Sequence, residues 1–190
     1  MINLIVFGIF AFIVLGFVLY LGTIYNGLIL VKNNILKAWS NIDVLLKQRH
    51  DEIPKLISAC ESYMKYEKGT LDSVVALRNT AASAASVGSK AQAESALSAG
   101  VAKIFALSEN YPDLKSNDSF QQLEKRISEL ESSIADRREF YNDTVNNYNI
   151  RIQSFPDSFV ANFMKLSAHE MFQVAEADRT DTPININVPS

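Results

Sequence analysis

The 190-residue sequence has one cysteine and two histidines, and it has no charged side chain before Lys32. A single cysteine, Cys60, excludes an intrachain disulfide, and we interpret it as a small apolar residue of a helix face rather than a reactive thiol. The histidines, His50 and His169, fall on different predicted helices, and a zinc site would need more ligands at suitable spacing. Because His50 precedes Asp51, we expect it on a solvated face.

Other chemical motifs are also missing. The sequence has no phosphate-binding glycine loop, no nucleophile elbow and no pattern typical of a catalytic triad. Its carboxylates are scattered along the chain rather than clustered. The net charge is −3 and no Lys/Arg-rich run occurs, which argues against a nucleic-acid partner. We therefore predict no catalytic residue, no cofactor, no metal ion and no enzymatic activity.

The uncharged N-terminus contains a long apolar run. Leu4 to Ile24 is 21 residues long, and about 20 apolar residues in a helix span the hydrocarbon core of a bilayer. Tyr20 and Tyr25 lie near its end and, with Lys32, are predicted to sit at the membrane interface. A signal peptide would need a basic start and a cleavage site, and neither is present. We predict an uncleaved transmembrane anchor over residues 1–26.

The basic residues closest to this span all follow it: Lys32, Lys37, Lys47 and Arg49. Loops rich in Lys and Arg stay on the cytoplasmic side of a membrane. This pattern predicts a short N-terminus outside and the remaining domain in the cytoplasm.

An apolar stripe with helical spacing runs from about residue 32 to residue 66. Its heptad positions include Ile35, Ile42, Arg49, Leu56 and Tyr63. Pro54 lies inside the pattern, but the stripe keeps its phase, so a kink is favoured over an end. The stripe either continues directly from the span or joins it through a short hinge at residues 25–27.

Residues 81–100 are rich in Ala, Ser and Gly, and they predict either helix or a connection with helix resuming near Ala91. Helix from there ends at Tyr111–Pro112. A second long helix follows, capped by Asn117 or Asp118 and stopped by Pro156. Its predicted apolar positions are Phe120, Leu123, Ile127, Leu130, Ile134, Tyr141, Tyr148 and Phe155.

A last helix is predicted to begin near Asp157 and to use Met171 and Phe172. The overall prediction is an all-α fold: a transmembrane helix, then an antiparallel helical bundle with two long helices, at about 30–67 and 118–155. The predicted divisions are an anchor over 1–26, a bundle over 27–176 and a flexible tail over 177–190.

Three charged residues are candidates for a structural role. Arg49 and Arg137 each occupy an apolar-stripe position on one of the two long helices, and Asp43 lies near the first stripe. An Arg–Asp arrangement could set the register of antiparallel helices. The alternative is that the arginine stems pack while their heads reach water.

Two stretches of the sequence resemble the LemA family. They are AWSNIDVLLKQRHDEIPKLI (Ala38 to Ile57) and YPDLKSNDSFQQLEKRISELESSIADRREFYNDTVNNYNIRIQSFP (Tyr111 to Pro156). The resemblance implies a bacterial protein of the inner (cytoplasmic) membrane, with a single N-terminal span and an antiparallel helical bundle. The family has no known catalytic residues, and members are discussed as membrane-associated scaffolds.

The expected function is a non-enzymatic, membrane-anchored helical scaffold that self-associates or organises a membrane patch. Its expected partners are the lipid bilayer and further copies of the chain. An adaptor for another membrane protein or a protease is the alternative, and a bundle with a ligand-binding or enzymatic site is a weaker one.

Overall fold

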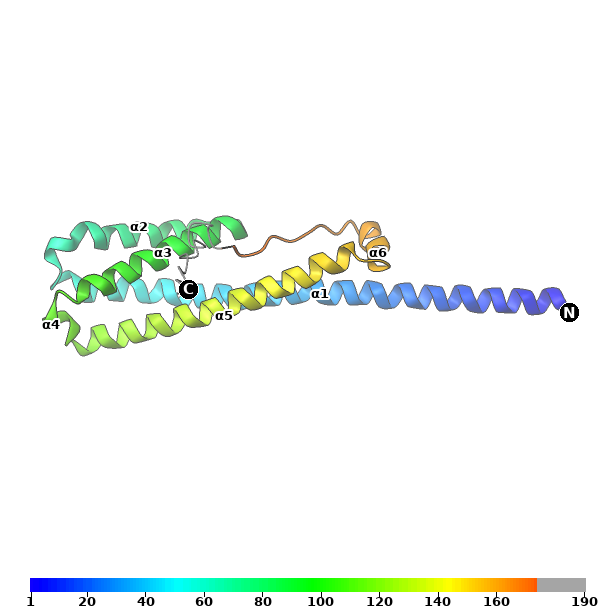
Figure 1. Cartoon of the computed structure of the whole chain (residues 1–190), viewed down its shortest axis with the longest axis horizontal. Helices are drawn as coiled ribbons and strands as arrows, with labels where there is room; N and C mark the ends of the chain where they lie inside the picture. Colours follow the sequence, from blue (N-terminus) through cyan, green and yellow to red (C-terminus); the bar gives the residue numbers. More distant parts are fainter. Residues whose placement is uncertain (174–190) are drawn as a thin grey trace, which may run out of the picture. The chain divides into compact units, whose positions relative to one another are not determined.

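The computed structural model describes residues 1–173 and confirms the all-α class (Figure 1). No strand occurs in this part of the chain. The predicted tail over 177–190 lies outside the described residues, and the predicted domain division stays a prediction. The helices are α1 (Ile2–Glu61), the 3-10 helix η1 (Lys65–Glu67), α2 (Lys68–Ser83), α3 (Val87–Ser108), α4 (Pro112–Lys115), α5 (Asp118–Gln153) and α6 (Asp157–Phe163).

Helix α1 runs without a break through residues 25–27, so of the two alternatives the apolar stripe continues directly from the apolar run, and the helix also continues through Pro54. It ends at Glu61, earlier than the predicted end near residue 67, and the chain turns so that Met64 is fully buried. The heptad prediction is wrong for Tyr63, which is exposed, because the helix has ended before this position. Ile35, Ile42, Leu56 and Arg49 are buried as their spacing predicts.

The described chain forms two compact units. Unit 1 contains residues 1–47 and 132–171, and unit 2 contains residues 48–131 together with residues 172–173. In unit 1, Trp39 packs on Tyr141 with ring centroids 5.5 Å apart, and Gly27 lies against Arg151. Residue numbers fall along α5 as they rise along α1, so these helices run antiparallel. The buried side chains of this pairing are Ile24, Leu28, Ile35, Ala38, Ile42, Leu46, Ile134, Tyr141, Val145, Tyr148 and Ile152.

Unit 2 has a core built from the end of α1, from α2 and α3, and from the start of α5. Its buried apolar residues include Ile53, Leu56, Cys60, Met64, Leu71, Val74, Leu97, Val101, Ile104, Leu114, Phe120 and Ile127. Close packing of such side chains is the main source of stability in a helical domain. Cys60 is fully buried, as the sequence predicts, and burial raises the pKa of its thiol to about 11.

The Ala/Ser/Gly-rich stretch is mostly helical. Helix α2 ends at Ser83, and α3 begins at Val87. Ser86 and Ser89 form a capping box, in which each side chain bonds the backbone N–H of the other residue. These bonds satisfy donors at the start of α3 that have no partner within the helix.

Helix α5 begins as predicted: Asn117 accepts hydrogen bonds from the backbone N–H groups of Ser119 and Phe120. The far end differs from the prediction. The helix ends at Gln153, and Phe155 lies beyond it with 80% of its surface exposed, so the predicted burial of Phe155 is wrong.

Helix α6 is shorter than the predicted last helix and ends at Phe163. Lys165 adopts a left-handed conformation (φ 53°), and the N–H of Leu166 donates to the carbonyl of Ala161. With the bond from Lys165 N–H to Asn162, this is a Schellman motif, which usually has glycine at the left-handed position. Lysine gave no stop signal in the sequence, and Met171 and Phe172 therefore lie outside any helix.

Pro54 leaves one carbonyl of α1 without its helical donor, because proline has no N–H to offer the oxygen of His50. Arg78 of α2 replaces that donor: its Nε donates to the His50 carbonyl over 2.8 Å. The proline thus creates an acceptor that joins α2 to α1 within unit 2.

Replacing Arg78 with Met should lower the free energy of unfolding by about 1–2 kcal/mol, because the carbonyl loses the donor that replaces its helical one. The loss should be smaller when Pro54 is also changed to Ala, because alanine supplies the helical N–H that proline lacks. Urea unfolding in mild detergent, followed by circular dichroism, measures both losses. Equal losses in the two backgrounds would show that Arg78 does not act through this carbonyl.

Candidate functional site

A buried ionic cluster in unit 2 joins α1, α3 and α5. Its centre is Arg49, whose side chain is 1% exposed. The guanidinium pairs with the carboxylates of Glu94 on α3 and Glu131 on α5. Its Nη1 also donates to Ser98 Oγ over 2.7 Å, and that hydroxyl lies 3.0 Å from Glu131 Oε2. One arginine therefore contacts two helices that come from distant parts of the chain.

His50 extends the cluster from the next position of α1. Its Nε2 lies 3.0 Å from Glu94 Oε1, and only 12% of its side chain is exposed. The prediction of a solvated face for His50 is wrong, because α3 covers this side of α1. Two cation-forming side chains thus face one carboxylate.

The charge state of Glu94 follows from these contacts. Burial by itself would raise the pKa of the Glu94 carboxyl, since a buried charge loses its hydration. The hydrogen bond from His50 and the charge of Arg49 outweigh burial and hold the pKa below its usual value. Glu94 is therefore ionised at neutral pH and matches the positive charge of Arg49.

A second ion pair lies one turn further along. Glu52 is buried, and its carboxylate lies 2.9 Å from Nε of Arg126 on α5 and 3.1 Å from Nζ of Lys55. Arg49 meets Glu131 while Glu52 meets Arg126, which fixes the antiparallel register of α1 and α5 in unit 2. Both pairs join α1 to α5 within unit 2.

The other predicted polar residues lie in unit 1 and are exposed. Asp43 lies on the surface of α1. Arg137 lines a groove of about 470 Å³ with Lys37 and Phe140. The structure gives Arg49 two glutamate partners, and sequence reasoning missed both of them.

The signal for Glu94 was present in the sequence. It is the only charged residue between Lys90 and Lys103, and it shares a three-and-four spacing with Ala91, Leu97 and Val101. A carboxylate on an apolar stripe needs a buried cation, and Arg49 is a cation on another apolar stripe. Pairing them required knowing that residues 87–108 form a helix.

The remaining predicted positions concern the membrane. One described helix, α1, is long and apolar enough to cross a bilayer, with a mean hydropathy of 2.9 in its most apolar window. Every residue from Met1 to Tyr20 is exposed. Tyr20 and Tyr25 are about half exposed, and Lys32 is partly exposed, just after the apolar run. Among the described residues, no group of three or more His, Cys, Asp or Glu side chains is placed to hold a metal ion.

Comparison of the sequence with known protein families identifies the family of this chain. The profile of the LemA family matches residues 38–187, which is 150 of the 190 residues. The chain belongs to the LemA family. The match includes the Arg49, Glu94 and Glu131 positions of the buried cluster and excludes the apolar run.

Two kinds of curated relative are similar to the chain. Protein LemA of Metamycoplasma hominis is 28% identical over 182 residues, which cover 90% of this chain and 81% of the relative. Magnetosome protein MamQ 2 of Paramagnetospirillum magneticum is 35% identical over 82 residues, which cover 43% of this chain and 29% of MamQ 2. Magnetosome protein MamQ of Magnetospirillum gryphiswaldense is 29% identical over the same share of each chain. The match with the MamQ proteins thus spans less than a third of their length.

Replacing Arg49 with Met should lower the free energy of unfolding by about 3–5 kcal/mol, because the buried carboxylate of Glu94 loses the guanidinium that it pairs with. Adding Glu94→Gln to this variant should recover part of the loss, since a neutral amide is cheaper to bury than a charge. Urea unfolding in mild detergent measures each change. Arg137→Met is the matched control: the residue is exposed, and its replacement should change stability by no more than about 0.5 kcal/mol. If Arg49→Met proved as stable as this control, the cluster would not hold the helices together.

Proposed function

We propose that this LemA-family protein is a non-enzymatic, membrane-anchored helical scaffold that self-associates or organises a patch of membrane. The observation that carries the proposal is the first third of α1, which is apolar, free of charge and exposed. In an aqueous environment, a large protein partner would be needed to shield 21 such residues from water, whereas a bilayer shields them directly. Because α1 has no break after this run, the bundle begins where the span ends.

Exposed apolar side chains beyond the span support self-association. In unit 1 these are Leu30, Leu36 and Val44 of α1, and Phe140 and Ile150 of α5, each more than half exposed. Apolar surface of this kind marks sites where proteins associate. The similarity to MamQ, which is named as a magnetosome protein, fits a role in an organised assembly. An adaptor that binds a different membrane protein through the same side chains is the second candidate.

The proposed location is the bacterial cytoplasmic membrane, with the N-terminus outside and the helical bundle in the cytoplasm. The support is the order of charges: none precedes Lys32, and Lys32 and Lys37 follow the span closely.

Both the anchor and its orientation can be tested by cysteine labelling in intact cells. Cys60 gives little background, because its thiol is buried and its pKa is raised to about 11. A membrane-impermeant maleimide should label Asn3→Cys and should label Ser128→Cys only after lysis. The wild-type chain is the control. Labelling of Ser128→Cys in intact cells would reverse the orientation, and release of the protein by alkaline carbonate would contradict the anchor.

Self-association can be tested by the mass of the purified full-length protein in mild detergent. We expect a discrete assembly larger than one chain, because association would bury the exposed apolar side chains of unit 1 against another copy. Removing residues 1–26 should leave a helical, water-soluble chain that associates less, as circular dichroism and light scattering would show. A monomeric full-length protein would exclude the scaffold and favour the adaptor, and an unfolded truncated chain would contradict the proposed division at residue 26.

A further inference from the structure

Three phenylalanines of unit 1 that follow α5 in the chain have largely exposed side chains. Phe155, Phe159 and Phe163 are 80%, 70% and 88% exposed. They follow one another at intervals of four, and the rings of Phe155 and Phe159 contact each other edge to face with centroids 5.9 Å apart. Burying one such side chain is worth about 1.5–3 kcal/mol, so three of them exposed together need an apolar cover.

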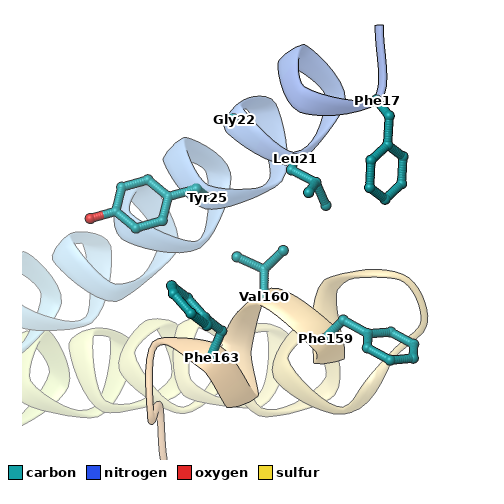
Figure 2. Close-up of a pocket in the computed structure, with 7 residues that line it drawn as sticks. All are labelled: Phe17, Leu21, Gly22, Tyr25, Phe159, Val160 and Phe163. Atoms are coloured by element: carbon teal, nitrogen blue, oxygen red, sulfur yellow. The ribbon is translucent and has the colours of Figure 1, made fainter. Parts of the chain in front are cut away.

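Two of the three phenylalanines, Phe159 and Phe163, lie beside the apolar run of α1. Phe159, Val160 and Phe163 of α6 line a cleft of about 570 Å³ whose other wall is Phe17, Leu21, Gly22 and Tyr25 (Figure 2). Figure 2 shows Val160 and Phe163 directed toward the α1 side of this cleft. The lining contains no charged residue.

The position of α6 along α1 sets its depth. At 1.5 Å per residue, the run from Leu4 to Ile24 is about 30 Å long, which matches the thickness of a hydrocarbon core. Phe17 lies about 10 Å before Ile24 by the same rise. When the run spans a bilayer, α6 therefore lies level with the last third of the hydrocarbon on the bundle side.

The charged groups near α6 lie close to Gly27, just beyond the end of the apolar run of α1. Asp157 is the only charged residue in α6, and it pairs with Arg151 of α5. The Arg151 guanidinium packs so closely on Gly27 that a Cβ atom there would clash with Nη2. Gly27 comes three residues after Ile24, where headgroups begin. An apolar edge facing the hydrocarbon and a charged edge facing the headgroups are typical of helices that lie in a membrane interface.

We propose that α6, together with Phe155, is a second membrane contact that lies in the bundle-side leaflet, with its phenylalanines among the acyl chains and with lipid filling the cleft against α1. The proposal rests on the proposed membrane anchor. The occupant is lipid rather than protein, because one wall of the cleft is the spanning run itself and is continuous with its lipid-facing surface. The protein then touches the bilayer at two points separated by more than 130 residues of sequence.

The test is quenching of tryptophan fluorescence by lipids with brominated acyl chains. The full-length chain with Trp39→Phe is reconstituted into phosphatidylcholine vesicles with and without bromine. One tryptophan is then introduced at a time, as Phe10→Trp in the span, as Phe159→Trp on α6 or as Phe140→Trp. Phe140 is the matched control: it is an exposed phenylalanine of unit 1, next to Tyr141, which packs on Trp39 about 22 Å along α1 beyond Ile24.

We expect brominated lipid to remove most of the fluorescence of Phe10→Trp and Phe159→Trp and to leave Phe140→Trp unchanged. Quenching of Phe10→Trp alone would overturn the second contact and leave the anchor in place. If the emission of Phe159→Trp were blue-shifted but not quenched, protein rather than lipid would occupy the cleft. That result would also overturn the second membrane contact. Equal quenching of Phe140→Trp would show that the whole domain lies on lipid and would remove the special role of α6. If Phe10→Trp were not quenched, the anchor itself would be wrong and this inference with it.

Discussion

Burial of the Arg49 charge is the constraint on which the arrangement of unit 2 depends. A guanidinium that is 1% exposed cannot be left without carboxylates, and its two partners come from α3 and α5. Glu94 is in turn buried and held ionised, so neither side chain is stable in this place without the other. Apolar packing would tolerate several alternative registers of α1 against α5, because its positions recur every three or four residues. The ion pairs favour one register: the buried Arg49 guanidinium pairs with the partly exposed Glu131 of α5, and the Glu52–Arg126 pair repeats this register one turn away.

Much of the fold could be predicted from the sequence, because the helices follow from patterns among neighbouring residues. The uncharged run up to Ile24 has the length of a membrane span, and the apolar spacing of α1 and α5 is helical. Helix α3 ends at Ser108, Pro112 opens the short helix α4, and Asn117 caps α5, each through backbone chemistry that depends on a few neighbouring residues. Pro54 was correctly interpreted as lying within a helix, because the apolar stripe kept its phase on both sides of it.

Only part of the candidate site could be predicted from the sequence, because the partners of its residues come from distant segments of the chain. Arg49 stood out as a cation on an apolar stripe, but Glu94 lay in a stretch whose structure the composition left open. His50 looked exposed beside Asp51, and only the packing of α3 against α1 buries it. The early end of α6 depends on a lysine in a left-handed conformation, where sequence rules look for glycine. The sequence left a hinge at residues 25–27 open as an alternative, but it did not show that the absence of a side chain at Gly27 makes room for Arg151.

The long separation between the members of the Arg49 cluster has a consequence for how the chain is made. Glu94 follows Arg49 by 45 residues and Glu131 follows it by 82. At about 5–20 residues per second, a ribosome adds Glu131 roughly 4–16 s after Arg49. During that interval the apolar stripe of α1 has been synthesised but α5 has not, while the α2–α3 pair needs only neighbouring residues and can form early. The nascent chain therefore carries an uncovered apolar stripe next to its proposed membrane anchor for several seconds, until α5 has been synthesised and can pack on it.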